Sequence, residues 1–210
     1  ANGGQWKFNE VAGDYGVEAG FLPAGVISNG EYETADGGGV CQVATTVFNA
    51  VYDAGYPVVK RQAHSLHMES YPDGRDAAVS YPELDFEWEN DTDSDVLMRM
   101  SYTDTTVTCT LYGVDPGYVV TTEAGEWSPG DPFKVKYEED ESLEEGKSKV
   151  KTVGTDGSYI QVKRIVSDRD GNVLREAVFT SNYLPINQIV IYGPGTDLAE
   201  LKAQYEAEEQ

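Results

Sequence analysis

A cysteine directly after three glycines is the residue best placed to do chemistry in this 210-residue chain. The glycines, Gly37–Gly39, let the backbone turn sharply and leave its N–H groups pointing outward. Beyond them, apolar side chains recur at helical spacing from Val43, and a glycine and a proline follow the last of them. This pattern predicts a helix over residues 42–54, with Cys41 at its start.

The start of a helix favours a thiolate, because its unpaired N–H groups and its dipole present positive charge. A thiolate is the form of cysteine that attacks carbonyl carbons and forms acyl-enzymes. Such a reaction also needs a base that moves protons and donors that bind the tetrahedral oxyanion. The alternative is that Cys41 is a small buried core residue, as most free cysteines are.

Of the two histidines in the chain, His64 is the candidate base, and Asp76 or Ser65 would orient its imidazole. Asp76 ranks first, because a carboxylate also stabilises an imidazolium. The alternative for His64 is an exposed loop histidine. His67 could join Cys41 and His64 in a zinc site, but in an extended segment the two histidines would point to opposite faces. The sequence therefore implies no metal and no cofactor.

The glycine loop and its surroundings provide the candidates for substrate contacts. The N–H groups of Gly39, Val40 and Cys41 would bind the oxyanion. Arg75 is one of few cations and could hold a substrate carboxylate through two hydrogen bonds, or simply pair with Asp73. The polar helix residues among the candidates could equally face solvent. The substrate-contacting set is Gly38, Gly39, Val40, Gln42, Thr45, Tyr71 and Arg75.

The formal net charge of −22 argues against nucleic acid or anionic lipid as a partner, since both would be repelled. No apolar run is long enough to span a bilayer, and the first residues lack a signal-peptide pattern. Two cysteines could form one disulfide, which would prevent Cys41 from acting as a nucleophile. We expect Cys41 and Cys109 to be free thiols, because Cys41 begins a helix and Cys109 lies within a strand.

The rest of the chain has the pattern of strands and turns. Asn29-Gly30 is a hairpin-type turn, the acidic run 138–141 indicates exposed loop, and the acidic tail is a short helix or frayed. A boundary falls between Gly113 and Gly117, so we expect residues 1–113 to fold without the rest. Strands are expected at 25–28, 57–60, 77–81, 84–88, 96–102, 107–112, 147–153, 159–167 and 174–181.

Two sets of motifs carry a resemblance to known families. The first set is Phe8-Asn9-Glu10-Val11-Ala12-Gly13, the run from Gly37 through Cys41 to Ala50, His64-Ser65, Tyr71-Pro72-Asp73-Gly74-Arg75-Asp76-Ala77 and Leu111-Tyr112-Gly113. In order and separation they resemble the VanW-domain family over about residues 5–113. The second set is Glu145-Gly146-Lys147, Tyr159–Ser167, Asp170-Gly171-Asn172 and Arg175-Glu176, which resembles the G-five domain more loosely.

The resemblance to VanW, a family named after glycopeptide-resistance clusters, implies work on the bacterial cell wall. Some VanW domains act as L,D-transpeptidases, which join peptidoglycan stem peptides through a cysteine acyl-enzyme. The partners would be stem peptides, with wall glycan a candidate ligand of residues 114–195. The protein would lie outside the cytoplasm, held by an anchor that is not in this chain.

Two alternatives to the transpeptidase stay open. One is a non-catalytic wall-binding module in which Cys41 is structural. The other is a cysteine amidase or carboxypeptidase on peptidoglycan, which shares the acyl-enzyme and differs only in the acceptor. The sequence does not distinguish water from an amine as that acceptor.

The expected fold class is α+β. Residues 1–113 would form a VanW-like catalytic domain with one principal helix packed on a mostly antiparallel sheet. Residues 114–195 would form an elongated, all-β, G-five-like accessory domain, followed by an acidic tail over 196–210.

Overall fold

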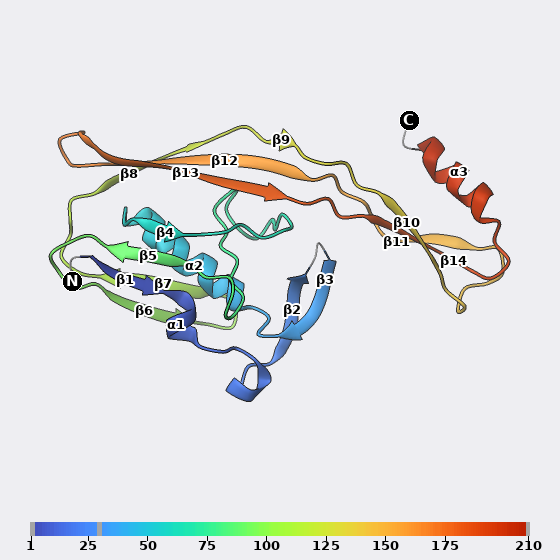
Figure 1. The fold of residues 1–210 in the computed structure, drawn as a ribbon, viewed down its shortest axis with the longest axis horizontal. Coiled ribbons are helices and arrows are strands. Elements are labelled where there is room, and N and C mark those ends of the chain that lie inside the picture. Colours follow the sequence, from blue (N-terminus) through green and yellow to red (C-terminus); the bar gives the residue numbers. More distant parts are fainter. Residues whose placement is uncertain (1–2, 29–30, 209–210) are drawn as a thin grey trace.

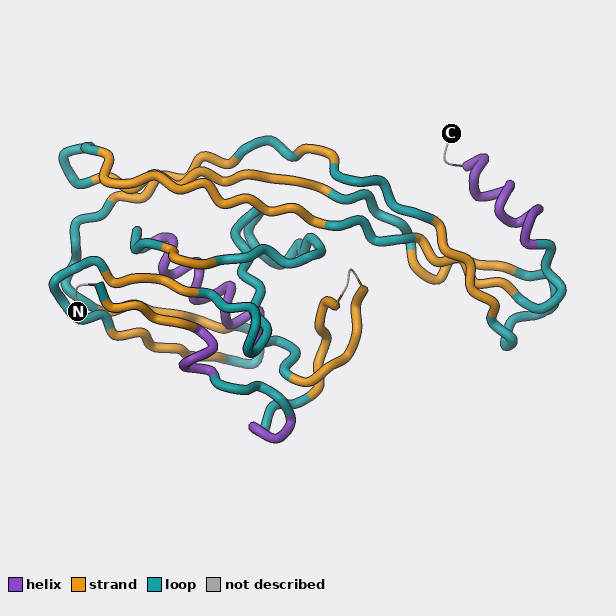
Figure 2. Tube along the Cα trace, in the orientation of Figure 1, coloured by secondary structure: helices purple, strands orange, loops and turns teal. Residues whose placement is uncertain are grey.

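The computed structural model describes residues 3–28 and 31–208. The molecule is elongated: a body surrounds helix α2, and a narrow sheet extends from the body toward α3 (Figures 1 and 2). The elements in chain order are β1 (Gly4–Lys7), α1 (Phe8–Ala12), the 3-10 turn η1 (Val17–Ala19), β2 (Pro23–Ser28), β3 (Glu31–Asp36), α2 (Val40–Asp53), β4 (Val58–Lys60), β5 (Glu87–Asn90), β6 (Leu97–Tyr102), β7 (Val107–Tyr112), β8 (Val119–Ala124), β9 (Ser128–Pro129), β10 (Val135–Glu139), β11 (Ser148–Thr152), β12 (Ser158–Ser167), β13 (Val173–Tyr183), β14 (Gln188–Tyr192) and α3 (Leu198–Glu208).

The described strands form several small sheets rather than the one predicted beside the helix. In the first half, β1, β5 and β4 form a sheet, while β2–β3 and β6–β7 are separate hairpins. In the second half, β13, β12 and β8 form a sheet whose β12 also pairs with β9. The distal sheet has the order β10-β14-β11, with β10 and β14 parallel. The fold is therefore mostly β, with helices of which α2 is the longest.

Helix α2 is central because its apolar residues lie on one face. It begins at Val40, two residues before the predicted start, since Gly39 supplies a left-handed N-cap with φ of 91°. That conformation is costly for any residue with a Cβ atom. The buried residues of its core face include Ala44, Val47, Phe48, Val51 and Tyr52.

The long β12–β13 hairpin covers the side of α2 opposite the strands of the first half (Figure 1). Val162 of β12 and Phe179 of β13 lie in the same hydrophobic core as Phe48 and Tyr52 of α2. The ring centroids of Phe48 and Phe179 are 5.5 Å apart and their planes make an angle of 63°, an edge-on geometry that is favourable for an aromatic pair. The core around α2 is therefore built from both halves of the chain.

Arg164 of β12 also ties the hairpin to α2. Its side chain is buried, with 1% of the residue exposed, and it donates to the carbonyl oxygens of Tyr52 and Tyr56 at 3.2 and 2.9 Å. Carbonyl groups at the C-terminal end of a helix lack hydrogen-bond donors within the helix. Arg164 supplies such a donor to Tyr52 in the last turn of α2, and another to Tyr56 just beyond it. These contacts argue against the independent folding of residues 1–113 that the sequence suggests.

Several details differ from the sequence-based expectation. Residues 77–81 lie outside the strands and form a single bridge, between Ser80 and Leu84. Strand β10 includes Glu138 and Glu139, which were expected in a loop. The tail forms α3, which is one of the two outcomes expected for it, and the predicted turn at Asn29-Gly30 lies outside the described residues.

Candidate active site

One face of α2 is fastened to residues 75–79 by a ladder of side-chain hydrogen bonds. Cys41 Sγ lies 3.4 Å from the carbonyl oxygen of Val79 and 3.5 Å from its N–H nitrogen. Thr45 Oγ1 makes the same pair of contacts with Ala77, at 3.2 and 3.0 Å. The next contact, from Asn49 Nδ2 to the carbonyl oxygen of residue 75, is 2.9 Å. We call this set the side-chain ladder.

The ladder fits because two periodicities nearly match. Residues four apart on a helix lie one turn, about 5.4 Å, along its axis, and alternate residues of an extended chain are about 6.6 Å apart. Between the rungs, the N–H of Ala78 donates to the carbonyl oxygen of Gln62 at 2.9 Å. The N–H groups of residues 77–79 and the carbonyl groups of Ala77 and Val79 thus have partners outside a sheet, which explains why the expected strand did not form.

The glycine loop precedes Cys41, whose contact with Val79 is the first of the side-chain ladder. Gly37, with φ of 75°, lies so close to Tyr15 that a Cβ atom there would come within 2.8 Å of its ring and carbonyl oxygen. Cys41 is half-buried, and its sulfur has two possible contacts with Val79. It can donate to the Val79 carbonyl as a thiol and accept from the Val79 N–H as a thiolate.

His64 and Asp76 form a buried pair beside Cys41. His64 Nδ1 lies 2.7 Å from Asp76 Oδ2, and the His64 backbone N–H donates to the same oxygen at 2.6 Å. His64 is 7% exposed and Asp76 is 2% exposed. His64 Nε2 is also buried and has no hydrogen-bond partner among the described residues. The imidazole therefore has one nitrogen held by the carboxylate and the other available.

The surroundings of His64 favour its protonated form. Burial acts to lower its pKa, but the hydrogen bond to Asp76 and the proximity of Cys41 outweigh burial and raise the pKa to about 9. Cys41 is therefore close enough to stabilise charge on the ring, although Nε2 makes no hydrogen bond of good geometry. This arrangement suits an imidazolium that can give a proton to a departing amine.

Asp76 has further partners that the sequence did not indicate. Arg61 Nη2 and the Tyr183 hydroxyl each donate to Asp76 Oδ1 at 2.8 Å. Burial would raise the pKa of Asp76, but the hydrogen bond from His64 and the charge of Arg61 hold it below its usual value. Ser65, the other candidate orienting residue, contributes its carbonyl oxygen, which accepts from the Leu184 N–H at 2.7 Å.

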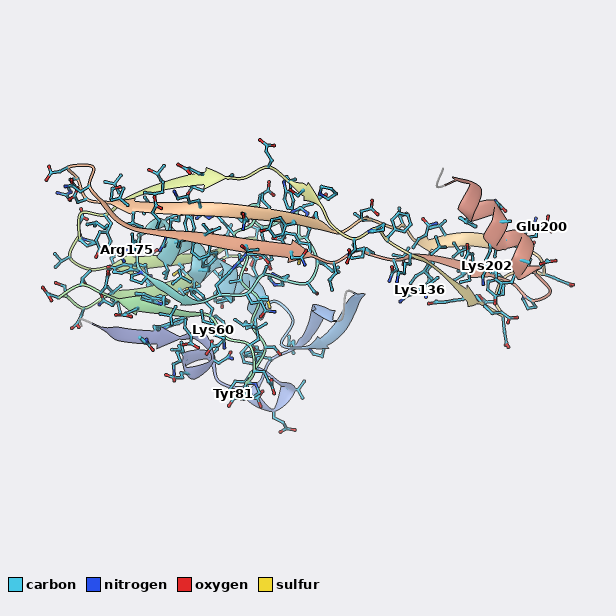
Figure 3. All side chains as sticks on the ribbon, turned by 45° about the horizontal axis from the view of Figure 1, so that its top comes forward. Lys60, Tyr81, Lys136, Arg175, Glu200 and Lys202 are labelled. Atoms are coloured by element: carbon cyan, nitrogen blue, oxygen red, sulfur yellow. The ribbon has the colours of Figure 1, made fainter. Side chains whose placement is uncertain are left out.

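Two tyrosines flank the thiol. The Tyr71 ring stacks on His64 with ring centroids 5.4 Å apart, and burial and then the charge of Cys41 raise its pKa to about 12. Burial, followed by the charge of Cys41, also raises the pKa of Tyr15. Tyr81, labelled in Figure 3, packs edge-on against Tyr15. Both phenols therefore stay protonated at neutral pH, and the Tyr15 hydroxyl donates to Asn9 Oδ1 at 3.5 Å.

The other predicted substrate contacts divide into two groups. Gly38, Gly39 and Gln42 are half-exposed or exposed around the start of α2, where a substrate can reach them. Val40 is a core residue whose N–H donates to Gly37 at 3.2 Å, so neither its side chain nor its amide is free for substrate. Arg75 lies elsewhere, paired with Asp53.

Arg75 lies at the third rung of the ladder, two helical turns from Cys41. Its guanidinium group pairs with Asp53 and lies 3.9 Å from the centre of the Tyr52 ring. This guanidinium is therefore occupied by contacts at the far end of α2. The structure does not bring it to the thiol, and Asp73, the pairing partner considered from the sequence, lies near His67 instead.

His67 and Cys109 also lie apart from the Cys41–His64 pair. His67 packs against Trp127 and Tyr183, with ring centroids 4.9 and 5.2 Å away. Cys109 is half-buried in β7, where burial raises its pKa to about 11. Both cysteines are free thiols, which confirms the prediction from the sequence. Within residues 3–28 and 31–208, no group of three or more His, Cys, Asp or Glu side chains is arranged to hold a metal ion.

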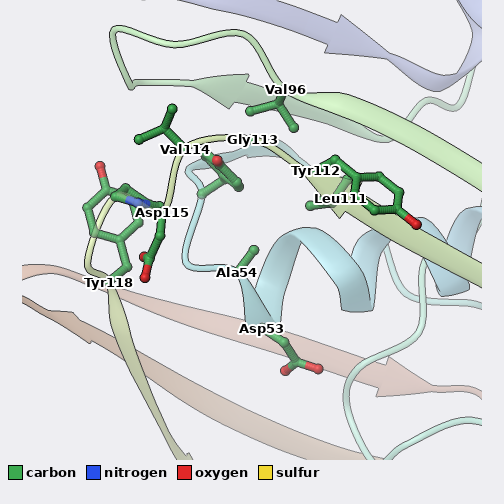
Figure 4. Close-up of a pocket in the computed structure, with 11 residues that line it drawn as sticks. Asp53, Ala54, Val96, Leu111, Tyr112, Gly113, Val114, Asp115 and Tyr118 are labelled. Atoms are coloured by element: carbon green, nitrogen blue, oxygen red, sulfur yellow. The ribbon is translucent and has the colours of Figure 1, made fainter.

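Two cavities lie away from the thiol. One, of about 280 Å³, is at the C-terminal end of α2 beneath residues 111–118 (Figure 4). The other, of about 400 Å³, lies beside His67 and Tyr183. Cys41 lines neither of them, so we expect its substrate to bind on the half-exposed surface around the start of α2.

The ladder predicts a difference between two adjacent threonines. Thr45→Val leaves the N–H and carbonyl groups of Ala77 without partners in a buried place, which should lower the free energy of unfolding by about 1–3 kcal/mol. Thr46→Val is the matched control, because the half-exposed Thr46 hydroxyl only donates back to Gln42 in its own helix. Urea denaturation of the two variants measures the difference. Equal destabilisation would mean that the ladder does not hold α2 in place.

The raised pKa of His64 predicts how stability depends on pH. The folded protein binds this proton more tightly than the unfolded chain, whose histidine has a pKa of about 6.5. The contribution is therefore complete below pH 6.5 and is lost as the pH rises through about 9. Denaturation between these pH values should show a loss of up to ~3 kcal/mol, and His64→Gln should flatten the slope. His67→Gln should keep the slope. If His64→Gln leaves the slope unchanged, the pH dependence of stability arises from another group.

A half-exposed cysteine beside a buried His–Asp pair defines a candidate site for thiol acyl transfer. Comparison with models of known protein families shows which family the chain belongs to. A model described as VanW like protein matches residues 1–112, and the G5 domain model matches residues 129–195. Because the first match covers more than half of the chain, the protein belongs to the VanW-like family. Within the described residues, no helix is long and apolar enough to cross a membrane.

Individual relatives agree with this assignment. Uncharacterized protein YoaR of Bacillus subtilis (strain 168) is 37% identical over 110 residues, which are 52% of this chain and 36% of that protein. The chain thus spans about a third of that relative's length. The VanW and G5 domains together indicate a cell-wall-associated protein that lies outside the cytoplasm.

Two solved structures of G5 domains resemble part of this chain. A crystal structure of HP0197-G5 is 23% identical in sequence and has a TM-score of 0.20. The match covers 36% of this chain and 97% of the HP0197-G5 chain. The IgA1 protease G5 domain structure is 20% identical, covers 49% of this chain and 93% of its own, and has a TM-score of 0.22. Both scores are too low to support an argument from shape.

Three residues of the candidate site were not predicted from the sequence. Tyr15, Arg61 and Tyr183 lie in no motif that indicates chemistry, and Tyr183 is more than a hundred residues from Asp76 along the chain. One signal was available for Arg61, which is a cation close to the His64-Ser65 motif in a chain with few cations. Nothing in the sequence indicated the other two.

Proposed function

We propose that this protein is a peptidoglycan L,D-transpeptidase that works through an acyl-enzyme on Cys41. The observation that carries the proposal is the His64–Asp76 pair, whose Nδ1 is held at 2.7 Å by the carboxylate, whose Nε2 has no hydrogen-bond partner among the described residues, and whose ring is close enough to Cys41 for the sulfur to raise its pKa. A helix start can favour a thiolate but cannot carry a proton to a departing amine. A titratable group next to the sulfur is therefore what a catalytic cysteine needs and a structural cysteine does not.

The reaction has two steps. In the first, Cys41 Sγ attacks the carbonyl carbon of a donor stem peptide, the C–S bond forms, the C–N bond breaks, and His64 Nε2 gives its proton to the departing amine. In the second, the amine of an acceptor stem peptide attacks the thioester, His64 Nε2 takes the proton, and the thiolate departs. The amides of Gly39 and Cys41, and the hydroxyls of Tyr15 and Tyr71, are the candidate donors to the oxyanion.

The overall charge is consistent with an amine as acceptor. A chain with a formal net charge of −22 attracts cations at long range and repels anions, so protonated amines are concentrated near it. The cations that it does carry are dispersed: Lys60 and Arg175 lie on the body, and Lys136 and Lys202 lie on the distal part (Figure 3). A hydrolase with the same thiol is the second candidate, because the half-exposed sulfur is also open to water.

Product analysis tests the proposal. The protein is incubated with tetrapeptide-containing wall fragments, and the products and the intact protein mass are determined by mass spectrometry. We expect an adduct on the protein and a cross-linked dimer of stem peptides. A shortened peptide without a dimer would assign a carboxypeptidase. If neither an adduct nor a product forms, the transpeptidase proposal fails, and a non-catalytic wall-binding module is the remaining function.

A further inference from the structure

Tyr183 reaches the candidate site from the part of the chain that matches the G5 domain. It is the last residue of β13, within the matched range 129–195. Its side chain is buried, with 3% of the residue exposed, and its hydroxyl donates to Asp76 Oδ1 at 2.8 Å. The hydroxyl therefore contacts the carboxylate on the oxygen that does not face His64.

The same end of β13 reaches Asp76 a second time, through Arg61. Arg61 Nη2 donates both to Asp76 Oδ1 and to the Ser181 hydroxyl, at 2.8 and 2.9 Å. Arg61 Nη1 donates to the carbonyl oxygen of Thr180 at 3.0 Å. The guanidinium is thus fixed between β13 and the carboxylate, with 4% of its side chain exposed.

The two oxygens of the Asp76 carboxylate have different partners. Oδ1 accepts from Arg61 and Tyr183, and Oδ2 accepts from the backbone and ring nitrogens of His64. Four donors fill the acceptor capacity of a carboxylate, so the group has one favoured orientation. Burial and the neighbouring Asp76 charge raise the pKa of Tyr183, so its hydroxyl keeps the proton that it donates.

We propose that Tyr183 is a positioning residue for the Cys41–His64 pair, and that the β12–β13 hairpin is therefore part of the catalytic centre rather than of a separate wall-binding module. By holding Oδ1, Tyr183 keeps Oδ2 directed at His64, and this contact in turn fixes the orientation of the imidazole near Cys41. The inference rests on the proposed function in treating Cys41 and His64 as the reacting groups. Tyr183 itself contacts no reacting atom.

The test is a comparison of Tyr183→Phe with Tyr192→Phe in the full chain. Tyr183→Phe removes only the hydroxyl and keeps the ring that packs against His67 and Trp127. Tyr192 lies in β14 of the distal sheet, so its variant makes the same chemical change away from Asp76. With a carbapenem as acylating probe, mass spectrometry gives the maximal acylation rate constant and the half-saturating concentration separately.

We expect Tyr183→Phe to lower the maximal acylation rate roughly tenfold, the effect of losing one hydrogen bond to a charged group. The half-saturating concentration should stay within about twofold, since the hydroxyl does not face the substrate. Tyr192→Phe should change neither constant. Ser181→Ala, which removes a partner of Arg61 from the same strand, should slow acylation to a smaller extent. Melting temperatures of all three variants show that they fold.

Two results would overturn the inference: an unchanged maximal rate in folded Tyr183→Phe, or a change confined to the half-saturating concentration. Failure of the proposed function would look different, because wild type would then form no adduct with the carbapenem or with a tetrapeptide donor. Alkylation of Cys41 by iodoacetamide decides the role of Tyr183 in that case, since it needs no substrate. Slower alkylation in Tyr183→Phe than in Tyr192→Phe supports the positioning role, and equal rates reject it.

Discussion

Cys41→Ala is expected to form no acyl adduct, and His64→Ala to form it roughly a hundred to ten thousand times more slowly than wild type. The first change removes the nucleophile. The second leaves a thiol at a helix start but removes the group that protonates the departing amine. Mass spectrometry of each variant with a carbapenem or a tetrapeptide donor measures both effects.

Two variants serve as controls for this prediction. Cys109→Ala removes a half-buried thiol whose pKa burial raises to about 11, so acylation should be unaffected. His67→Ala should be close to neutral, because His67 packs against Trp127 and Tyr183 rather than Cys41. A zinc site would be damaged by the loss of either histidine. Equal acylation of wild type and His64→Ala would reject the Cys41–His64 pair, and an adduct on Cys41→Ala would reject the whole mechanism.

A chain cut after Gly113 is expected to lose both its fold and the selective reactivity of Cys41. The cut removes Val162 and Phe179 from the core around α2, and Arg164 from the carbonyl groups at the end of that helix. Loss of a buried aromatic side chain alone costs about 3–5 kcal/mol, and a typical domain is stable by only about 5–15 kcal/mol. Circular dichroism with urea, together with the rate of Cys41 alkylation, measures the result.

A cut after Gly195 is the matched control. It removes α3 and the tail but keeps the β12–β13 hairpin, so the body around α2 should unfold cooperatively and Cys41 should react as in the full chain. A folded 1–113 fragment with wild-type alkylation would contradict the expectation. It would then support the division at Gly113 that the sequence suggests, and Tyr183 would have no part in holding the site.

Local patterns predicted the parts of the site that depend on neighbours in sequence. Three glycines followed by apolar residues at helical spacing predicted α2 to within two residues at its start and one at its end. The pairing of His64 with Asp76, twelve residues apart in the chain, was expected, and the structure places Nδ1 of His64 2.7 Å from Oδ2 of Asp76. Their catalytic roles stay predictions.

Patterns of single strands were less informative. Residues 77–81 have the composition of a strand, yet the side chains of Cys41 and Thr45 take the backbone groups that a strand would use. A sequence pattern shows which side chains are apolar, but not whether the partner of a backbone N–H is a strand or a side chain of a helix. Arg75 shows the same limit, because its charge suggested a carboxylate partner on a substrate and the fold supplied Asp53 instead.

By itself, the sequence determined that a thiol begins a helix after a glycine turn and that a histidine and an aspartate follow it, because these features depend on residues close together in the chain. Only the tertiary structure decided how Asp76 is held, since Arg61 and Tyr183 meet on its Oδ1 from segments 15 and 107 residues away. It also decided that β12 and β13 complete the core around α2. Such contacts form when buried apolar surface brings distant strands together, and no short pattern in the chain records which strands will meet.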